Sequence, residues 1–288
     1  MTGLQAAVLG FVQGLTEFLP VSSSGHLVLG QYLFGLREAA LFFDISVHMG
    51  TLAAVILYFR KDTLALAAGA IRLTRYGGQA IRKRGGMGAA LSGDDAARTA
   101  AMILAGSLPT ALIGLALHRY ADTLFASTTI TGVCLILTAG ILGATWRRRA
   151  ASSDAPAPDA ETGKTGAASL RISLPAALLI GVVQGLAVFP GISRSGATIA
   201  AGLFLGLSRD AAARFSFLLS IPAIAGAQVL GLADAGNIHL DSACLTGPLV
   251  AAVTGYAALV LLVYMVKKGR LHYFAPYCLA AGIFALSL

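Results

Sequence analysis

Charged side chains are scarce in this sequence. Asp, Glu, Lys and Arg together make up 12% of its 288 residues, whereas a soluble globular domain has about 25%. Hydrophobic residues account for 57%, and the mean hydropathy is +0.78. This balance excludes an ordinary soluble domain and indicates an integral membrane protein that crosses the bilayer several times.

Cysteine is also scarce and irregularly placed. Cys134, Cys244 and Cys278 lie far apart, in or near apolar segments. An odd number at this spacing provides neither a disulfide framework nor a zinc-binding pattern. We interpret the three as small buried hydrophobic side chains. No basic segment precedes the first apolar run, so we expect no cleavable signal peptide.

The basic residues do not indicate a nucleic-acid partner, although the net charge at neutral pH is +8. Most of them fall between apolar runs, chiefly in segments 60–98 and 147–171 and around Lys267. Cytoplasmic loops of membrane proteins are enriched in Lys and Arg. We therefore interpret these residues as an orientation signal that places the basic segments on the cytoplasmic side.

Long apolar runs predict six full membrane spans. A span needs about 20 predominantly apolar residues. Two polar segments interrupt the series: a basic, Gly-rich loop at 60–98, and a linker at 147–171 that contains Ala-Pro-Ala-Pro-Asp. The expected spans are about 40–59, 99–117, 127–146, 212–233, 245–266 and 274–288.

Two further apolar stretches, 3–36 and 175–207, are each broken by a polar turn. Neither half of the first is long enough to span the membrane, and Pro20 and Gly25 disrupt a helix between them. We expect each stretch to form a re-entrant helix pair, which enters the membrane and returns to the same side. Backbone that is broken at this depth has to be covered by protein or line a cavity.

The second interrupted stretch repeats the first without a gap. Each half of the chain then contains one re-entrant pair and three spans, so the two halves must have opposite orientations. The predicted fold is an all-α polytopic membrane protein, a single domain over 1–288 with inverted repeats at 1–146 and 172–288. The aligned residues are Gly10 and Gly181, Gln13 and Gln184, Gly14 and Gly185, Leu15 and Leu186, Phe18 and Phe189, Ser22 and Ser193, Ser24 and Ser195, Gly25 and Gly196, Gly35 and Gly206, and Leu36 and Leu207.

The two polar turns have the composition of an anion site. The first lies within QGLTEFLPVSSSGH, Gln13 to His26, and the second is PGISRSG, Pro190 to Gly196. Each precedes a helix, whose first amide groups lack partners and carry partial positive charge. Two such helix starts that converge can bind an anion, and Arg194 adds a guanidinium suited to phosphate. The expected phosphate-binding residues are Ser22, Ser24, Gly25, Ser193, Ser195, Gly196 and Thr198.

Anion binding alone does not account for Glu17 and His26. Glu17 can hold a divalent cation or accept a proton, and His26 can act as an acid, a base or a nucleophile. Ser23 can attack if either of them accepts its proton. Together with Arg194, these side chains suit phosphoryl transfer by positioning and charge neutralisation. The sequence leaves the nucleophile open between Ser23, His26 and water.

Three further polar residues are candidates for supporting roles. Asp44 and His48 are four residues apart and therefore lie on one face of the first full span. They either support the site from behind or pair with each other. Gln184 is equivalent to Gln13 in the repeat, and both amides are candidates for hydrogen bonds that hold the two helix pairs together.

QGLTEFLPVSSSGH and PGISRSGAT closely resemble the two signature motifs of the undecaprenyl-diphosphatase family, the bacitracin-resistance phosphatases. The similarity extends over almost the whole chain. It implies an enzyme of the bacterial inner membrane that hydrolyses undecaprenyl diphosphate to the monophosphate and phosphate, and so recycles the carrier lipid for peptidoglycan. It also implies inverted repeats, a site open to the periplasmic side, and catalytic roles for Glu17, Ser23 and His26, with Arg194 as the phosphate-binding arginine.

The resemblance further implies a divalent cation, Mg2+ or Ca2+, with Glu17 as the candidate ligand. The family's first motif often has two glutamates, and the earlier one corresponds here to Gln13. An amide is a poor base and a weaker metal ligand than a carboxylate. This departure puts the coordination of the cation in question.

A transporter is the alternative interpretation. Inverted repeats with broken helices that meet at mid-depth are a common transporter plan, so the same pattern suits a lipid-phosphate flippase or an anion transporter. Release of phosphate from the substrate distinguishes the enzyme from the transporter. The expected partners are a polyprenyl diphosphate lipid and the bilayer, with no nucleic acid, and the sequence leaves a homodimer open.

Overall fold

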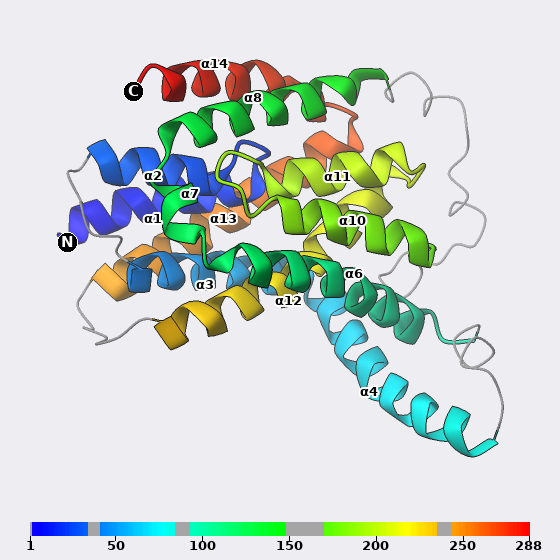
Figure 1. The fold of residues 1–288 in the computed structure, drawn as a ribbon. Coiled ribbons are helices and arrows are strands. Elements are labelled where there is room, and N and C mark those ends of the chain that lie inside the picture. Colours follow the sequence, from blue (N-terminus) through cyan, green and yellow to red (C-terminus); the bar gives the residue numbers. More distant parts are fainter. Residues whose placement is uncertain (1, 34–40, 84–92, 148–169, 235–242) are drawn as a thin grey trace.

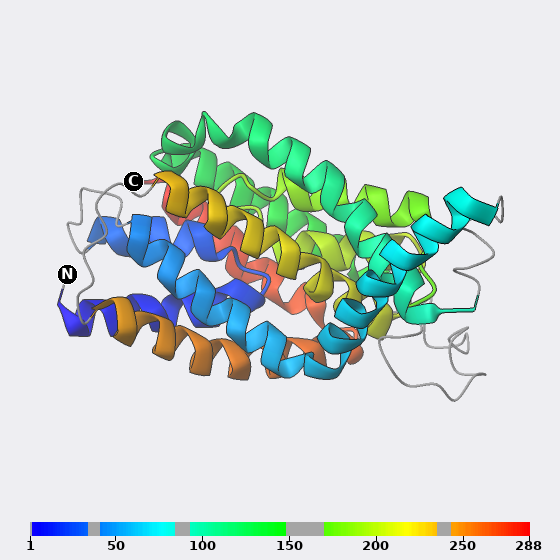
Figure 2. The ribbon, with the colours of Figure 1, turned by 90° about the horizontal axis from the view of Figure 1, so that it is seen from below.

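The computed structural model describes residues 2–33, 41–83, 93–147, 170–234 and 243–288. Every regular element in this part of the chain is a helix, as the sequence predicts, and most of the helices run along one another in a bundle (Figures 1 and 2). The linker predicted at 147–171 lies almost wholly outside the described residues. In chain order the helices are α1 (Gly3–Phe18), α2 (Ser23–Leu33), α3 (Leu41–Tyr58), α4 (Arg60–Lys83), α6 (Asp95–His118), α7 (Ala121–Phe125), α8 (Thr128–Ala144), α10 (Leu174–Leu186), α11 (Arg194–Phe204), α12 (Arg209–Asp234), α13 (Ala243–Lys267), the 3-10 helix Leu271–Phe274 and α14 (Ala275–Leu286).

Local sequence signals set where these helices begin and end. At the start of α1, the Thr2 side chain accepts a hydrogen bond from the Gln5 amide at 3.2 Å, and the Gln5 side chain accepts one from the Thr2 amide at 2.9 Å. Such a capping box satisfies amides that a helix start leaves without partners. Asp94 and Ser173 cap α6 and α10 with one hydrogen bond each. α1 ends just before Pro20, which cannot continue a helix.

Three of the described helices, α6, α12 and α13, are long and apolar enough to cross a membrane. α3 has 18 residues and is followed, after a bend of 89°, by α4, so this pair can count as a fourth span. The apolar helix Thr128–Ala144 is shorter than the span expected at 127–146, and Leu271–Leu286, near the span expected at 274–288, is likewise below membrane-spanning length. The set of helices fits a protein that crosses the membrane several times.

The prediction of a loop over 60–98 is wrong for its first part, because residues Arg60–Lys83 form α4. Glycine and basic residues gave this segment the composition of a loop. In the structure, Gly69 is buried against the backbone of α6, and Arg72 pairs with Asp94, with Nε at 2.5 Å from Oδ2. Packing against α6 therefore stabilises a helix that the composition does not favour by itself.

The first helix of each half packs against a helix of the other half. α1 runs along α13, and α10 runs along α6. Gly10 faces the backbone of Gly247, and Gly181 faces the backbone of Gly106, so closely that a Cβ at either position would collide with a carbonyl oxygen. Gly10 and Gly181 are aligned in the repeat. α1 and α10 begin at opposite ends of the bundle, and the turns that follow them lie next to each other (Figures 1 and 2).

Large apolar side chains point outward on the helices of membrane length. Along α6, Leu104, Leu108, Leu112 and Leu115 follow one another at helical spacing, and each is more than half exposed. On α13, Val253 is 72% exposed. Contiguous apolar surface is rare on soluble monomers, whereas a helix whose backbone is internally hydrogen-bonded can present it to lipid.

We expect Gly181→Ala to destabilise the bundle. The added Cβ would collide with the carbonyl oxygen of Gly106, and overpacking of this kind costs about 1–3 kcal/mol. The measurement is the unfolding midpoint of the purified protein in detergent. Gly140→Ala, at a helical glycine with open space around the Cβ position, is the control and should keep or raise the midpoint. An unchanged midpoint for Gly181→Ala would contradict the close crossing of α6 and α10.

Candidate active site

The two helix breaks have the same local geometry. At the first, Ser22 precedes α2, and its Oγ accepts a hydrogen bond from the Gly25 amide at 3.4 Å. At the second, Ser193 precedes α11, and its Oγ accepts one from the Gly196 amide at 3.1 Å. Both are hydrogen bonds of the N-cap type. In each turn the serine two residues later also contacts the capping hydroxyl, Ser24 at 3.2 Å and Ser195 at 3.3 Å. The repeat in the sequence is thus also a repeat of local structure.

The two turns touch each other. The Gly191 amide donates to Ser22 Oγ at 3.0 Å. The backbone angle φ is 68° at Ser22 and 96° at Gly191, in the left-handed region that only glycine adopts freely. Thr138 of α8 holds the second turn, because its Oγ1 donates to the Gly191 carbonyl at 2.9 Å and accepts from the Ser193 amide at 3.1 Å. The junction is therefore fixed from three separate segments of the chain.

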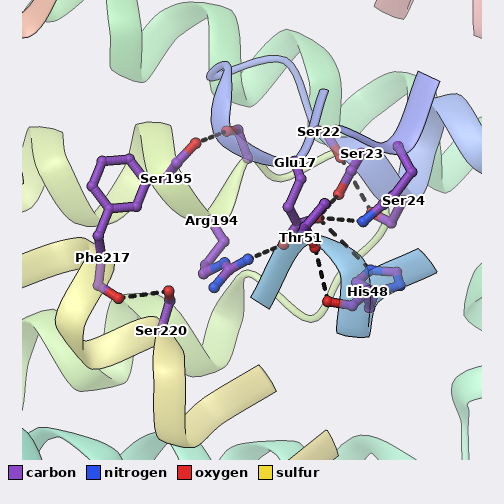
Figure 3. Close-up of polar contacts among 12 residues, drawn as sticks. Glu17, Ser22, Ser23, Ser24, His48, Thr51, Arg194, Ser195, Phe217 and Ser220 are labelled. Atoms are coloured by element: carbon purple, nitrogen blue, oxygen red, sulfur yellow. Dashed lines mark hydrogen bonds and ion pairs between the residues drawn. The ribbon is translucent and has the colours of Figure 1, made fainter. Parts of the chain in front are cut away.

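Glu17, in the last turn of α1, is the centre of the polar contacts at this junction (Figure 3). Its side chain is 3% exposed, and a buried carboxylate without a partner would cost several kcal/mol. Arg194, the first residue of α11, forms an ion pair with Oε1. Oε2 accepts hydrogen bonds from the Ser23 hydroxyl at 2.5 Å and from Gln13 Nε2 at 2.9 Å. The structure thus brings a carboxylate from one half and a guanidinium from the other into one site.

His48 of α3 completes the surroundings of Glu17. Its Nε2 lies 3.7 Å from Glu17 Oε2, and its Nδ1 lies 2.7 Å from the backbone oxygen of Asp44, one turn earlier. Since a carbonyl only accepts, Nδ1 carries a hydrogen. From the sequence, His48 is a support for the site or a partner of Asp44. The structure places the His48 ring against the Glu17 carboxylate (Figure 3), and the contact of Asp44 with this ring is through its backbone carbonyl at Nδ1.

Two buried atoms beside Glu17 have no hydrogen-bond partner in the part of the chain that the structure describes. They are Gln13 Oε1 and Arg194 Nη1. Buried polar atoms without partners are rare. The orientation of the Gln13 amide follows from the carboxylate, because the reversed amide would direct its oxygen at Glu17. The site therefore offers one donor and one acceptor to a ligand. A phosphate oxygen can accept from Arg194 Nη1, and a hydroxyl or a water bound to phosphate can donate to Gln13 Oε1.

His26 lies apart from this cluster. Its Nδ1 is 2.8 Å from the backbone oxygen of Ser22, and its Nε2 is 2.6 Å from the hydroxyl of Tyr277 in α14. In the described part of the chain these are its hydrogen bonds, and neither reaches Glu17. Tyr277 is not predictable from the sequence, because 251 positions separate it from His26 and a single tyrosine in an apolar helix gives no signal of its own.

Several hydroxyls that the sequence suggests for phosphate binding are engaged inside the protein. Ser193 and Ser195 are 2% and 4% exposed and contact each other. Thr198 is fully buried, donates to the Arg194 carbonyl at 2.8 Å and contacts the hydroxyl of Ser216. In this arrangement the three residues hold the start of α11, and with it Arg194, in place.

Gln184 is directed elsewhere than its counterpart Gln13. Its Nε2 donates to Thr110 Oγ1 and to the Leu219 carbonyl, both at 3.3 Å. It thereby ties α10 to α6 and α12. The repeat places Val188 opposite Glu17, so the second half has no carboxylate at the equivalent position. The polar centre belongs to the first half, with Arg194 supplied by the second.

The residues around Glu17 do not form a cage for a divalent cation. Mg2+ and Ca2+ require several oxygen ligands, but a guanidinium flanks this carboxylate, and Gln13 presents its NH2 group to it. Within the described ranges, no group of three or more His, Cys, Asp or Glu could hold a metal ion. The donor set therefore does not fit a cation held by the protein alone.

Comparison with known proteins places the chain in a family. The model of a family described as bacitracin resistance protein BacA matches residues 6–284. The undecaprenyl-diphosphatase of Desulfosudis oleivorans is 50% identical over 288 residues, which are 98% of this chain and 97% of the relative. Those of Desulforapulum autotrophicum and Methanosphaera stadtmanae are 48% and 41% identical, over 98% and 99% of this chain and 96% and 97% of the relatives. Since the match extends over nearly the whole chain, this protein belongs to the BacA family of bacitracin resistance proteins.

Proposed function

We propose that this protein is an undecaprenyl-diphosphatase, which hydrolyses undecaprenyl diphosphate to undecaprenyl phosphate and phosphate. The observation that carries the proposal is the Glu17–Arg194 site at the junction of the two helix breaks, in a chain 50% identical to a relative of that name. The reaction returns the carrier lipid to peptidoglycan synthesis, and the family name links it to bacitracin resistance. The polyprenyl tail of the substrate suits the apolar outer faces of the helices.

The diphosphate would bind where the two turns meet. Arg194 Nη1 is buried and has no partner in the described part of the chain, so it is available to a phosphate oxygen. The starts of α2 and α11 add the partial positive charge of their first amides. Phosphoryl transfer depends mainly on positioning and on neutralising the charge of the phosphate. These groups supply both.

Ser23 is the nucleophile that the geometry favours. Its hydroxyl already donates to Glu17, which is the contact expected between a nucleophile and its base. In the proposed step Ser23 Oγ bonds to the terminal phosphorus, its proton passes to Glu17, and the bond to the bridging oxygen breaks and releases undecaprenyl phosphate. Water then cleaves the phosphoserine. When the diphosphate draws Arg194 toward itself, Glu17 loses its ion pair and becomes a better proton acceptor.

The proposal includes two inverted repeats in the membrane, with re-entrant pairs at 3–36 and 175–207. Three observations support it: α1 and α10 begin at opposite ends of the bundle, their glycines make matching crossings with α13 and α6, and the two turns have equivalent caps. The sequence places the basic segments on the cytoplasmic side. As the family resemblance implies, we propose that the site opens to the periplasmic side of the inner membrane.

A lipid-phosphate flippase or anion transporter is the second candidate, because broken helices that meet inside a bundle also suit transport. The distinguishing assay measures release of inorganic phosphate from a polyprenyl diphosphate by the purified protein in detergent. An enzyme releases phosphate without any membrane gradient, whereas a transporter releases none.

Arg194→Ala and Glu17→Gln should each lower turnover by at least about a hundredfold, since one removes the charge that neutralises phosphate and the other the proton acceptor. Phosphate release under substrate saturation is the measurement. Arg75→Gln, at an exposed arginine of α4, is the control and should keep normal turnover. Near-normal rates in either site variant, with the protein still folded, would remove Glu17 and Arg194 from the mechanism.

Ser23 attack predicts a covalent intermediate. Protein mixed with substrate labelled in the terminal phosphate and quenched in acid should carry label on Ser23, and Ser23→Ala should carry none and lose turnover. Ser107→Ala, which removes a hydroxyl that donates within α6, should be labelled like the original protein. If the original protein never carries label while phosphate is released, water attacks directly.

The divalent cation is proposed in a restricted form. The residues beside Glu17 do not form a cage, so a cation would enter together with the diphosphate, whose oxygens supply ligands. Gln13→Glu would set a second carboxylate where Nε2 now lies 2.9 Å from Glu17 Oε2. Two carboxylates so close need a proton or a cation between them. We therefore expect Gln13→Glu to depend more steeply on Mg2+ or Ca2+ than the original protein, as measured by turnover against free cation concentration. Identical curves would contradict this account of the site.

A further inference from the structure

His26 and Tyr277 form a close pair outside the contacts of Glu17. The Tyr277 hydroxyl lies 2.6 Å from His26 Nε2. The two rings are stacked, with centroids 5.7 Å apart and an angle of 9° between their planes. A hydrogen bond and a stacked ring together restrain both the position and the rotation of an imidazole, which either contact alone would leave partly free.

The hydrogen bonds of His26 determine where its proton lies. Nδ1 faces the backbone oxygen of Ser22 at 2.8 Å, and a carbonyl only accepts, so Nδ1 carries the hydrogen. Nε2 then has a lone pair and accepts from the Tyr277 hydroxyl. His26 is held as a single tautomer whose Nε2 is the proton-accepting nitrogen. Without the phenol, the Ser22 carbonyl still keeps the hydrogen on Nδ1, but Nε2 loses the hydrogen bond that holds it in one position.

Cys278, the residue after Tyr277 on α14, contacts the start of the turn that Tyr277 contacts through His26. Cys278 is fully buried, and its thiol donates to the Pro20 carbonyl at 3.2 Å. α14 itself packs closely on α8, where Gly132 and Gly282 meet. Two consecutive side chains of the last helix therefore contact the break between α1 and α2 before and after its serines. Tyr277 is 50% exposed, so its hydroxyl is not needed to fill the core.

We propose that Tyr277 is a positioning residue, which fixes the ring orientation of His26 and the position of its Nε2 for the phosphatase reaction. The inference rests on the proposed function and on the catalytic part that the motif assigns to His26. Tyr277 acts through His26, and the geometry gives it no contact with Glu17. Its contribution is to hold Nε2, which the Ser22 contact leaves without a hydrogen, in one position, as a proton acceptor or as the nitrogen that passes a proton on.

Tyr277→Phe keeps the stacked ring and removes the hydroxyl alone. We expect kcat to fall about five- to tenfold, the effect of one lost hydrogen bond, with KM little changed because the phosphate contacts are intact. In the His26→Gln background, Tyr277→Phe should lower kcat no further. Tyr273→Phe, which changes another tyrosine whose ring contacts a histidine, His272, edge to face, is the matched control and should keep normal kcat.

The second measurement is the nitrogen NMR spectrum of histidine-labelled protein in detergent, with the His26 signals assigned from His26→Gln. The original protein should show His26 with hydrogen on Nδ1 and an Nε2 signal shifted by the hydrogen bond from the phenol. Tyr277→Phe should keep the hydrogen on Nδ1 and move the Nε2 signal to the position of a nitrogen without that donor. This spectrum does not depend on turnover. It would therefore show whether Tyr277 holds His26 even if the protein had no phosphatase activity. A His26 spectrum unchanged by Tyr277→Phe, or a further loss of kcat in the His26→Gln background, would overturn the inference.

Discussion

The buried ion pair between Glu17 and Arg194 is the interaction on which the arrangement of the molecule depends. Either charge alone in an apolar bundle would cost several kcal/mol, and each comes from a different half of the chain. The pair is stable only if the two helix breaks meet. The contact between Ser22 and Gly191 and the support from Thr138 bring the breaks to that distance. In the function that we propose, the phosphate of the substrate replaces the Glu17 carboxylate as the partner of the Arg194 guanidinium.

The rest of the bundle serves this junction through close backbone packing. Glycines at the α1–α13 and α6–α10 crossings let helices approach within contact of carbonyl oxygens, so the breaks that follow α1 and α10 reach the same point. Helices in a membrane associate through such small-residue contacts, because lipid provides no hydrophobic drive to bring them together. The same packing leaves the large apolar side chains on the outside, where the lipid substrate resides.

Much of the fold could be predicted because the signals are local. The apolar runs, the proline and glycine breaks and the repeat of Gly, Gln and Ser positions follow from residues close in sequence, and the helices lie near the expected ranges. The segment at 60–98 was misjudged because its helix is stabilised by α6, through Gly69 and the Arg72–Asp94 pair. Composition shows that glycine disfavours a helix here, but it does not show that α6 packs against this segment and stabilises the helix.

At the site, the order of residues establishes which groups are present: a carboxylate, three serines and an imidazole in one break, and an arginine in the other. Which of these groups meet depends on the folded arrangement of the helices. This arrangement places His48 against Glu17, turns His26 toward Tyr277, and engages Thr198 and Ser195 inside the bundle. A hydrogen bond requires its donor and acceptor to be placed to within a fraction of an ångström. For residues far apart in the chain, this placement is set by how whole helices pack.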